Sequence, residues 1–224
     1  MTQVEKLAKR VLDVTSSALG LMLLTPLFLV IAAAIKAQSP GPVFYRGLRA
    51  GRGGRPFRIF KFRTMIAGAD AIGSSSTPDD DSRITRFGGF LRKYKLDELP
   101  QLFNVLLGEM SLVGPRPQVL WALERYSAED LEVLNVRPGI TDWASLRFAD
   151  EGEILRGAAD PDTEYFEKIH AEKMRLALQY VRSSSFVGDL RILWQTFALL
   201  FGPRTVRSEN DPLADTGANS THRQ

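Results

Sequence analysis

An apolar segment near the N-terminus constrains the fold of this chain more than any other feature. From residue 14 to residue 35 there is no charged side chain, and most residues are Leu, Ile, Val, Ala or Phe. That length is sufficient for a helix to cross a lipid bilayer. Pro26 interrupts the run, where it removes one helical hydrogen bond and clashes with the preceding turn. We therefore expect a helix with a kink at Thr25-Pro26.

Three membrane arrangements compete for this segment. A signal peptide has a shorter apolar core and a small-residue cleavage site, whereas this core is long and is followed at once by Lys36. A simple spanning helix would carry its basic flank on the cytoplasmic side, but basic residues flank both ends here. A helix over 1–38 that enters the membrane, bends at Pro26 and leaves on the same face satisfies both observations. The sequence favours this re-entrant helix and leaves a single span as the alternative.

The distribution of charge and the absence of cysteine narrow the function. Through position 63 there are eleven basic residues and two acidic ones, although the net charge of the whole chain is only +3. Such a basic N-terminal third is typical of chains that bind anionic lipid, nucleic acid or phosphorylated substrates. The absence of cysteine excludes disulfides, thiolate metal sites and cysteine nucleophiles. The two histidines, His170 and His222, cannot build a zinc site, so carboxylates must supply acid–base and metal chemistry.

A small β-hairpin is expected after the breaker cluster Ser39-Pro40-Gly41-Pro42. Residues 43–46 form one apolar run, and residues 57–65 alternate apolar and basic side chains with the period of a half-buried strand. Its polar face would carry Arg58, Lys61 and Arg63. No nucleic-acid-binding signature accompanies these basic residues, so no nucleic-acid partner is expected.

Two adjacent carboxylates, Asp97 and Glu98, are the candidate site. Basic residues precede them: Arg92, Lys93 and Lys95. Adjacent carboxylates repel each other, and neighbouring cations or a bound metal would offset that cost. Residues 99–107 read as a helix whose first turn tolerates Pro100, which places Asp97 near the N-cap. The alternative is that Asp97 only caps this helix and that Glu98 is an ordinary first-turn acid, and local spacing does not decide between the two.

The rest of the chain reads as mostly helical. Residues 165–180 have an amphipathic pattern, and residues 186–201 are strongly apolar but too short for a span. An interfacial helix over 186–201 is the favoured interpretation, with a buried core helix as the alternative. Residues 204–224 are polar and are expected to be a disordered tail after a catalytic domain over 39–203. The expected fold class is thus α+β, predominantly helical.

Four motif blocks resemble one family. The order of these blocks along the chain closely resembles that of the bacterial sugar transferases, which are the small monotopic polyprenyl-phosphate phosphoglycosyl transferases. The resemblance covers roughly residues 9–202. The matching blocks are Lys61-Phe62-Arg63-Thr64-Met65, Leu96-Asp97-Glu98-Leu99-Pro100-Gln101-Leu102-Phe103-Asn104-Val105, Ser111-Leu112-Val113-Gly114-Pro115-Arg116-Pro117 and Val136-Arg137-Pro138-Gly139-Ile140-Thr141.

The resemblance implies a sugar-1-phosphate transferase that moves a phospho-sugar from a UDP-sugar to a polyprenyl phosphate such as undecaprenyl phosphate, releasing UMP. In the family the aspartate of the Asp-Glu pair is the nucleophile, so Asp97 is expected to form an aspartyl-phosphosugar intermediate. The polyprenyl phosphate would then attack this intermediate, which gives ping-pong kinetics. Mg²⁺ is the expected cofactor, with Asp97 and Glu98 as its ligands. Glu98 would act as a base or as the metal partner.

Several arginines and a lysine are the expected substrate-binding residues. Arg116 suits a phosphate clamp, because Pro115 and Pro117 restrict its backbone and a guanidinium binds two phosphate oxygens at once. The further candidates are Lys61, Arg63, Arg92 and Arg137, and for Arg137 a structural bond within its turn is an equal alternative. After Thr141 the chain departs from the common family pattern, and Arg147 is the candidate to replace the family's usual Gly-Arg arginine.

The resemblance also implies a location. A re-entrant helix would make the protein monotopic, in contact with membrane lipids, on the cytoplasmic face of the bacterial inner membrane. There it would catalyse the first membrane step of a surface glycan, such as an exopolysaccharide, a capsule, an O-antigen or a glycoprotein glycan. A homodimer is compatible with the sequence. The alternative function is a non-catalytic membrane adaptor whose basic N-terminal third docks lipid or an enzyme partner.

Overall fold

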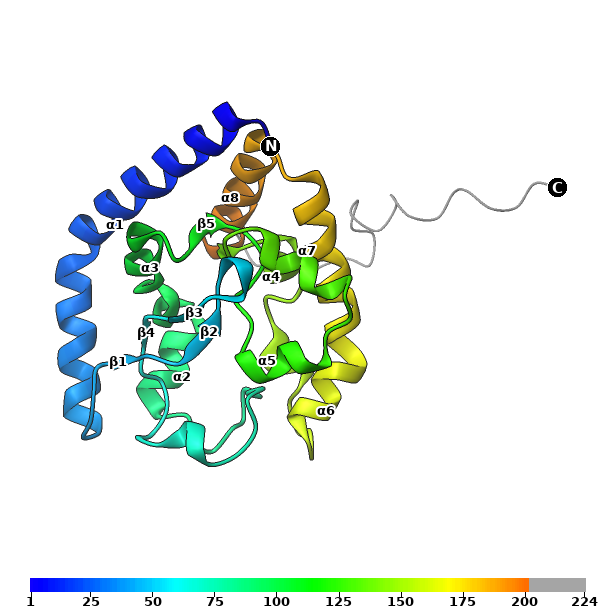
Figure 1. The fold of residues 1–224 in the computed structure, drawn as a ribbon. Helices are drawn as coiled ribbons and strands as arrows, with labels where there is room; N and C mark the ends of the chain where they lie inside the picture. Colours follow the sequence, from blue (N-terminus) through cyan, green and yellow to red (C-terminus); the bar gives the residue numbers. More distant parts are fainter. Residues whose placement is uncertain (202–224) are drawn as a thin grey trace.

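The computed structural model describes residues 1–201, which form a mostly helical body with a few short strands (Figure 1). The α-helices are α1 (Gln3–Gln38), α2 (Arg86–Lys93), α3 (Gln101–Leu107), α4 (Trp143–Arg147), α5 (Glu151–Ile154), α6 (Pro161–Tyr165), α7 (Ala171–Ser183) and α8 (Phe186–Phe201). The strands are β1 (Phe44–Tyr45), β2 (Leu48–Ala50), β3 (Pro56–Arg58), β4 (Lys61–Phe62), β5 (Ser111–Val113) and β6 (Gly139–Thr141). The predominantly helical fold class is confirmed, whereas the tail expected over 204–224 lies outside the described residues.

Helix α1 is one continuous helix of 36 residues that contains Pro26. Thr2 and Glu5 begin it with a reciprocal capping box, in which each side chain accepts a hydrogen bond from the other's backbone N–H. Before the proline, the Thr25 hydroxyl donates to the carbonyl of Leu21 at 2.7 Å, a contact that often bends helices. In Figure 1 the upper and lower halves of α1 run in different directions.

Most of the α1 surface does not pack on the protein. The helix is long and apolar enough to cross a membrane, and only 11% of its most apolar window is buried. Leu23 is 73% exposed and Leu29 is 67% exposed. So large an apolar surface is unusual in water and indicates a membrane or another apolar partner.

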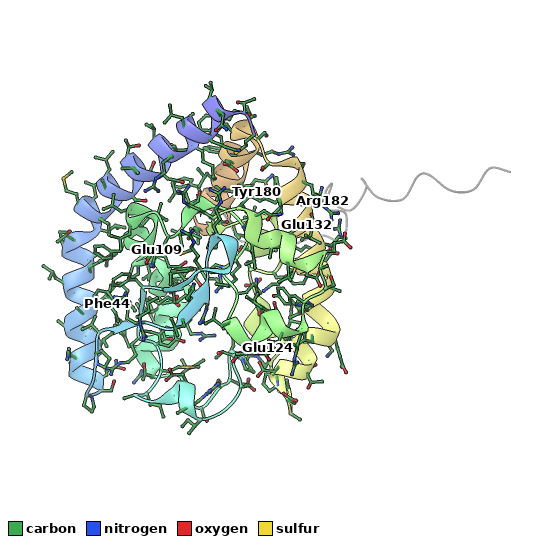
Figure 2. The ribbon with its side chains drawn as sticks, viewed as in Figure 1. Phe44, Glu109, Glu124, Glu132, Tyr180 and Arg182 are labelled. Carbon is green, nitrogen blue, oxygen red and sulfur yellow. The ribbon has the colours of Figure 1, made fainter. Side chains whose placement is uncertain are left out.

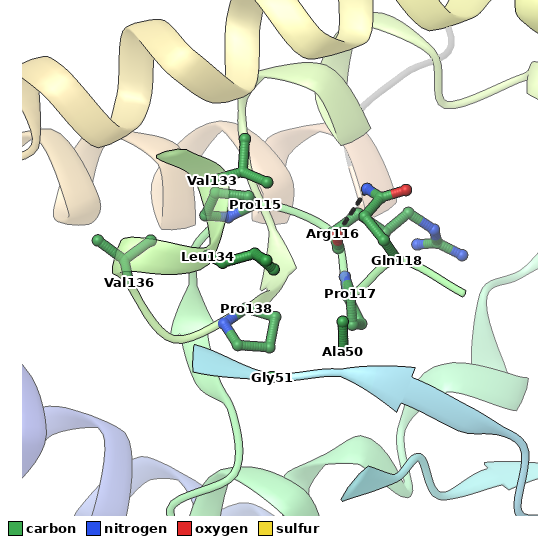
Figure 3. A pocket seen from close by; sticks show the side chains of 10 residues that line it. All are labelled: Ala50, Gly51, Pro115, Arg116, Pro117, Gln118, Val133, Leu134, Val136 and Pro138. Carbon is green, nitrogen blue, oxygen red and sulfur yellow. Dashed lines mark hydrogen bonds between the residues drawn. The ribbon is translucent and has the colours of Figure 1, made fainter. Parts of the chain in front are cut away.

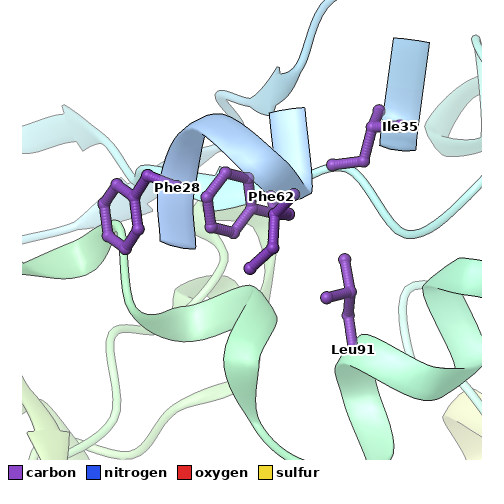
Figure 4. Close-up of a cluster of buried hydrophobic side chains, with 5 residues drawn as sticks. Phe28, Ile35, Phe62 and Leu91 are labelled. Carbon is purple, nitrogen blue, oxygen red and sulfur yellow. The ribbon is translucent and has the colours of Figure 1, made fainter. Parts of the chain in front are cut away.

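One face of α1 packs against β4 and α2. Phe28 and Ile35 bury their side chains against Phe62 of β4 and Leu91 of α2 (Figure 4). The rings of Phe28 and Phe62 meet edge to face, with centroids 5.1 Å apart. This cluster fixes the second half of α1 to the strand that carries Lys61.

Polar groups fix the first half of α1. Lys9 forms an ion pair of 2.6 Å with buried Asp189 of α8 and donates to the carbonyl of Val113 at 2.8 Å. Asp13 is also buried, and its carboxylate accepts hydrogen bonds from the Ser111 hydroxyl and the Leu112 backbone N–H. Both Lys9 and Asp13 thus contact β5, and this strand holds the N-terminal half of α1 against the core.

The expected β-hairpin is confirmed, in two short antiparallel ladders. β1 pairs with β4 in the register Phe44 opposite Phe62, and β2 pairs with β3 in the register Leu48 opposite Arg58. Phe57 and Ile59 are buried while Arg58 is exposed, as the alternating pattern predicts.

A second, parallel pair holds the turn that follows β5. β5 and β6 pair with Ser111 opposite Gly139, and Gly139 donates its backbone N–H to the carbonyl of Pro115 at 2.9 Å. A Cβ atom on Gly139 would lie 2.1 Å from the backbone nitrogen of Gly114. Only glycine permits this close approach, which sets where the turn 114–117 leaves the strand.

The C-terminal helices cover the other side of these strands. Residues 161–183 form a nearly continuous helix of α6, a π-helical turn over Phe166–His170, and α7. Arg182 pairs with Glu129 at 2.8 Å and with Glu132 at 3.1 Å, which ties the end of α7 to the segment beside it (Figure 2).

Helix α8 is buried on one face only. Ile192 is fully buried, while Val187 is 74% exposed and Trp194 is 71% exposed. A helix buried in a protein core would not expose such large apolar side chains on its outer face.

Candidate active site

The carboxylate pair lies in a tight turn ahead of α3. Lys95 adopts a left-handed backbone conformation with φ of 55°, and the turn Leu96–Glu98 that follows is a 3-10 helix. Helix α3 begins only at Gln101, with Pro100 at its N-cap position. The prediction that Asp97 lies near the N-cap is therefore wrong, because the left-handed Lys95 starts a separate turn before the helix. The turn instead places the Glu98 carboxylate between Lys61 of β4 and Arg116 of the turn 114–117.

Glu98 holds two cations with one oxygen. Its Oε1 accepts from Lys61 Nζ at 2.7 Å and from Arg116 Nη2 at 2.8 Å. Burial alone would raise the pKa of Glu98, but Arg116 and Lys61 hold it well below its ordinary value. Burial also lowers the pKa of Lys61, while the Glu98 charge raises that of Arg116. Glu98 is thus ionised at neutral pH and holds Lys61 and Arg116 in place.

Asp97 has the opposite electrostatic environment. Its side chain is 8% exposed, and burial followed by repulsion from Glu98 raises its pKa, although Lys61 opposes the shift. Within residues 1–201 no group donates a hydrogen bond to its carboxylate. A carboxylate with a raised pKa and uncommitted lone pairs is a better base and nucleophile than an ordinary one. Two neighbouring acids whose pKa values are driven apart are typical of a catalytic site.

The two flanking prolines and a hydrogen-bond bridge fix the backbone of Arg116. The side-chain amide of Gln118 donates to the backbone carbonyl of Arg116 at 2.8 Å. The backbone carbonyl of Gln118 in turn accepts from the backbone N–H of Ala50 at 2.8 Å. Leu134 and Pro138 are among the residues that line a shallow hollow behind this turn, and the Arg116 side chain extends away from them (Figure 3). The Arg116 side chain is 42% exposed, so a ligand can reach it while the backbone that carries it is fixed.

The other sequence-predicted residues lie at different distances from the pair. Arg92 donates to the Thr77 carbonyl at 3.2 Å, and its charge lowers the pKa of Asp97, so it belongs to the site's surroundings. Arg63 is buried and donates to the carbonyls of Ser39 and Pro40, at 2.8 and 2.6 Å, which ties the hairpin to the end of α1.

Arg137 and Arg147 make other contacts. The Arg137 guanidinium donates to the Gly108 carbonyl at 2.9 Å, the structural bond weighed as its alternative role. Arg147 is exposed at the end of α4, where its charge lowers the pKa of Glu172. The structure thus gathers Asp97, Glu98 and Lys61 with Arg116 and places these two arginines outside that group.

A second charged group beside Arg116 was missed from the sequence. Glu151 of α5 pairs with Lys173 of α7, and the Lys173 ammonium lies 5.3 Å from the centre of the Tyr165 ring. Asp142 caps α4 by accepting from Ser145 N at 2.7 Å, and its second oxygen is buried with no hydrogen-bond partner among residues 1–201. The charges of Glu151 and Asp142 both raise the pKa of Arg116. No short-range motif marked these residues, because they come from three separate segments.

The donor set suits a magnesium ion that is shared with a substrate. No group of three or more metal-ligating side chains occurs in residues 1–201, so the protein could supply two carboxylates at most here. Mg²⁺ in phosphoryl-transfer sites is commonly held by one or two carboxylates together with substrate phosphates and water. The uncommitted Asp97 carboxylate and the adjacent Glu98 fit that requirement.

Comparison with known proteins gives consistent matches. The family model described as bacterial sugar transferase matches residues 4–203. A UDP-glucose:undecaprenyl-phosphate glucose-1-phosphate transferase of Caulobacter vibrioides is 42% identical over 193 residues, which are 85% of this chain and 68% of that protein.

Two further relatives differ in length and in the donor they name. A UDP-N-acetylgalactosamine-undecaprenyl-phosphate N-acetylgalactosaminephosphotransferase of Aeromonas hydrophila is 36% identical, over 88% of this chain and 45% of that protein. The exopolysaccharide production protein ExoY of Rhizobium meliloti is 36% identical, over 85% of this chain and 84% of that protein. The chain therefore spans less than half of some relatives and most of others.

Proposed function

The chain belongs to the bacterial sugar transferase family, and from this premise we propose that it transfers a sugar phosphate from a UDP-sugar to undecaprenyl phosphate, releasing UMP. The observation that carries the proposal is the pair Asp97 and Glu98, in which one acid is uncommitted and the other organises Lys61 and Arg116. Two relatives are named for this transfer, with UDP-glucose and UDP-N-acetylgalactosamine as donors.

The first half-reaction is a displacement at the phosphorus that bears the sugar. A carboxylate oxygen of Asp97 attacks this phosphorus, and the bond to the bridging oxygen of the diphosphate breaks. UMP leaves with the electron pair, so that the sugar phosphate is bound to Asp97 as an acyl phosphate. Arg116 and Lys61 stabilise the negative charge that develops on the phosphoryl and leaving-group oxygens.

The second half-reaction returns the enzyme to its starting state. A phosphate oxygen of undecaprenyl phosphate attacks the same phosphorus, and the bond between phosphorus and Asp97 breaks. The carboxylate is regenerated and the product is undecaprenyl diphospho-sugar, so the overall kinetics are ping-pong. Glu98 keeps the two cations in place throughout, because its charge persists at neutral pH.

Mg²⁺ is part of the proposal, with Asp97 and Glu98 as its protein ligands. When bound, it would neutralise the diphosphate and the departing UMP. The product would be the first membrane-linked sugar of a surface glycan, and exopolysaccharide is the class that one relative's name supports.

The proposal places α1 in the membrane as a re-entrant helix, with the site on the cytoplasmic face. Pro26, the Thr25 contact to Leu21 and the exposed apolar surface of α1 support this placement. The apolar outer face of α8, with Trp194, would then lie at the membrane interface. Both helices would thereby bring the carboxylate pair close to the phosphate of a lipid acceptor.

Purified protein in detergent micelles should release UMP continuously only when a UDP-sugar, Mg²⁺ and undecaprenyl phosphate are all present. Without the acceptor it should release at most about one UMP per enzyme, because the covalent intermediate cannot turn over. EDTA should reduce the rate to background, and restoring Mg²⁺ should return it. UMP release is the measurement, over a panel that includes UDP-glucose and UDP-N-acetylgalactosamine. Absence of UMP release from every UDP-sugar, in protein that is shown to be folded, would refute the proposed function.

Topology can be tested directly, since the chain has no cysteine of its own. Single cysteines at Lys6 and Lys36 should both resist a membrane-impermeant thiol reagent applied to the periplasmic side of cells. Both should react in inverted vesicles, because a re-entrant helix leaves its two ends on the cytoplasmic face. Labelling of either position from the periplasm would favour the single span instead.

A further inference from the structure

We propose that Glu151, held in place by Lys173, accepts hydrogen bonds from hydroxyl groups of the donor's hexose and so selects the sugar. The inference rests on the proposed function, because it requires a UDP-sugar in the site. It assigns a role to the charged group beside Arg116 that the transfer chemistry leaves unused.

One oxygen of Glu151 remains available to a ligand. Lys173 binds Oε2, whereas Oε1 accepts no hydrogen bond within residues 1–201. The Glu151 side chain is 31% exposed and that of Lys173 is 13% exposed, so the carboxylate lies on the open side of the pair. A ligand would therefore contact the Glu151 carboxylate more readily than the Lys173 ammonium.

The location of Glu151 favours the hexose over the other parts of the donor. Its charge raises the pKa of Arg116, and Lys95, next to the carboxylate pair, helps to lower its own pKa. The loop over 77–79 links Glu151 to the site geometrically: Thr77 accepts from Arg92 of α2, which packs against the turn of the carboxylate pair, and Asp79 donates to Gly152, the neighbour of Glu151. Glu151 therefore lies on the side of the molecule where the donor would bind. A carboxylate repels phosphate, so its partner must be a neutral group with hydrogen-bond donors. The hexose is attached directly to the reacting phosphorus, while the ribose is one phosphate further away.

The carboxylate is suited to act as a fixed, purely accepting group. Burial alone would raise the pKa of Glu151, but Lys173 and Arg116 hold it below its ordinary value. The rings of Tyr165 and Phe148 lie 5.3 and 5.8 Å from the Lys173 ammonium, which restricts its movement. Hydrogen bonds from hydroxyls to an ionised acceptor are among the stronger ones available to a protein.

A neighbouring loop fixes the backbone at this point. Asp79 donates its backbone N–H to the Gly152 carbonyl at 3.0 Å, and a Cβ atom on Gly152 would lie 2.0 Å from Asp79 Oδ1. Gly157 donates its backbone N–H to Asp80 at 3.2 Å. The acidic loop therefore abuts α5 and fixes the backbone next to Glu151.

The test compares Glu151→Gln with Glu153→Gln. Glu153 lies on the same short helix, and both partners of its ion pair with Arg156 are exposed. With UDP-glucose, UDP-N-acetylgalactosamine and the monodeoxy analogues of UDP-glucose, the wild-type protein should lose about tenfold or more in kcat/KM when a recognised hydroxyl is missing. Glu151→Gln should raise KM for the intact donor by about tenfold and lose this discrimination, whereas Glu153→Gln should match the wild type.

Inhibition by UMP separates the sugar from the nucleotide. The inhibition constant of UMP should be the same in the wild type and in Glu151→Gln, because UMP has no hexose. An equal rise in both constants would overturn the inference, since Glu151 would then contact the nucleotide. Unchanged KM and unchanged discrimination in an active Glu151→Gln protein would overturn it too. A wild-type protein that is inactive with every donor would instead refute the proposed function.

Lys173 is a positioning residue in this scheme, and its variants provide a second readout. Lys173→Met should weaken discrimination among the deoxy analogues, because Glu151 loses the group that orients it. Lys173→Arg keeps a cation at the same place and should restore most of the discrimination. Equal discrimination in both variants would show that the ion pair does not orient the carboxylate.

Discussion

Replacing Asp97 with asparagine is expected to reduce turnover by about a thousandfold or more, because the proposed nucleophile is lost while the shape of the side chain is kept. Glu98, Lys61 and Arg116 would remain, so donor binding should persist. The loss should therefore appear in kcat. UMP release measures the rate, and radiolabelled donor should leave sugar phosphate on the wild-type protein but not on Asp97→Asn.

The stability of this variant provides an internal check on the interpretation. The pKa of Asp97 is raised in the folded protein, so its contribution to stability falls as the pH rises through that value. At neutral pH the ionised carboxylate is thus a cost to the fold, and neutral asparagine removes it. Asp97→Asn should unfold at the same temperature as the wild type or higher. Lost activity could then not be attributed to unfolding.

A matched control and two adverse outcomes complete this experiment. Asp70→Asn changes an exposed aspartate in the loop before α2 and should leave both turnover and labelling unchanged. If Asp97→Asn retained normal turnover, the covalent mechanism would be wrong. If wild-type protein showed no turnover and cells tolerated Asp97→Asn, the adaptor hypothesis would gain support.

Features that are local in the chain were predictable from the sequence. The hairpin follows from alternation over residues 57–65 and a breaker cluster before it, and both are visible within a few residues. The apolar N-terminal helix follows from its composition alone. The motifs single out Arg116 as a phosphate clamp but do not predict its bond to Glu98 at 2.8 Å, which only the structure shows.

Features that depend on tertiary contacts were not predictable. Arg63 continues the polar alternation of its strand, yet it is buried because the end of α1 offers it backbone carbonyls. Asp97 reads as a helix cap, yet the left-handed Lys95 places it in a separate turn. Glu151 and Lys173 are 22 residues apart and meet only because α5 folds back onto α7. None of these contacts can be predicted from the periodicity of the sequence.

Gly139→Ala is the structural substitution from which we expect the largest effect. Its Cβ would lie 2.1 Å from the nitrogen and 2.6 Å from the Cα of Gly114, both of them backbone atoms that cannot rotate away. We expect a loss of about 2–4 kcal/mol in the free energy of unfolding, measured by denaturant titration. The turn that carries Arg116 must also shift, and a displacement of about 1 Å can cost about a hundredfold in rate.

Gly89→Ala is the matched control for this change. A Cβ on Gly89 would have only one neighbour, at 3.9 Å, and an alanine inside helix α2 should stabilise the protein slightly. Gly139→Ala should affect both stability and the position of Arg116, and Arg116→Lys separates these two effects. It should lower kcat while leaving the unfolding free energy near the wild-type value. If Gly139→Ala kept both stability and rate, the contact between β5 and β6 would be looser than described. If it lost stability but not rate, Arg116 would be positioned by its prolines alone.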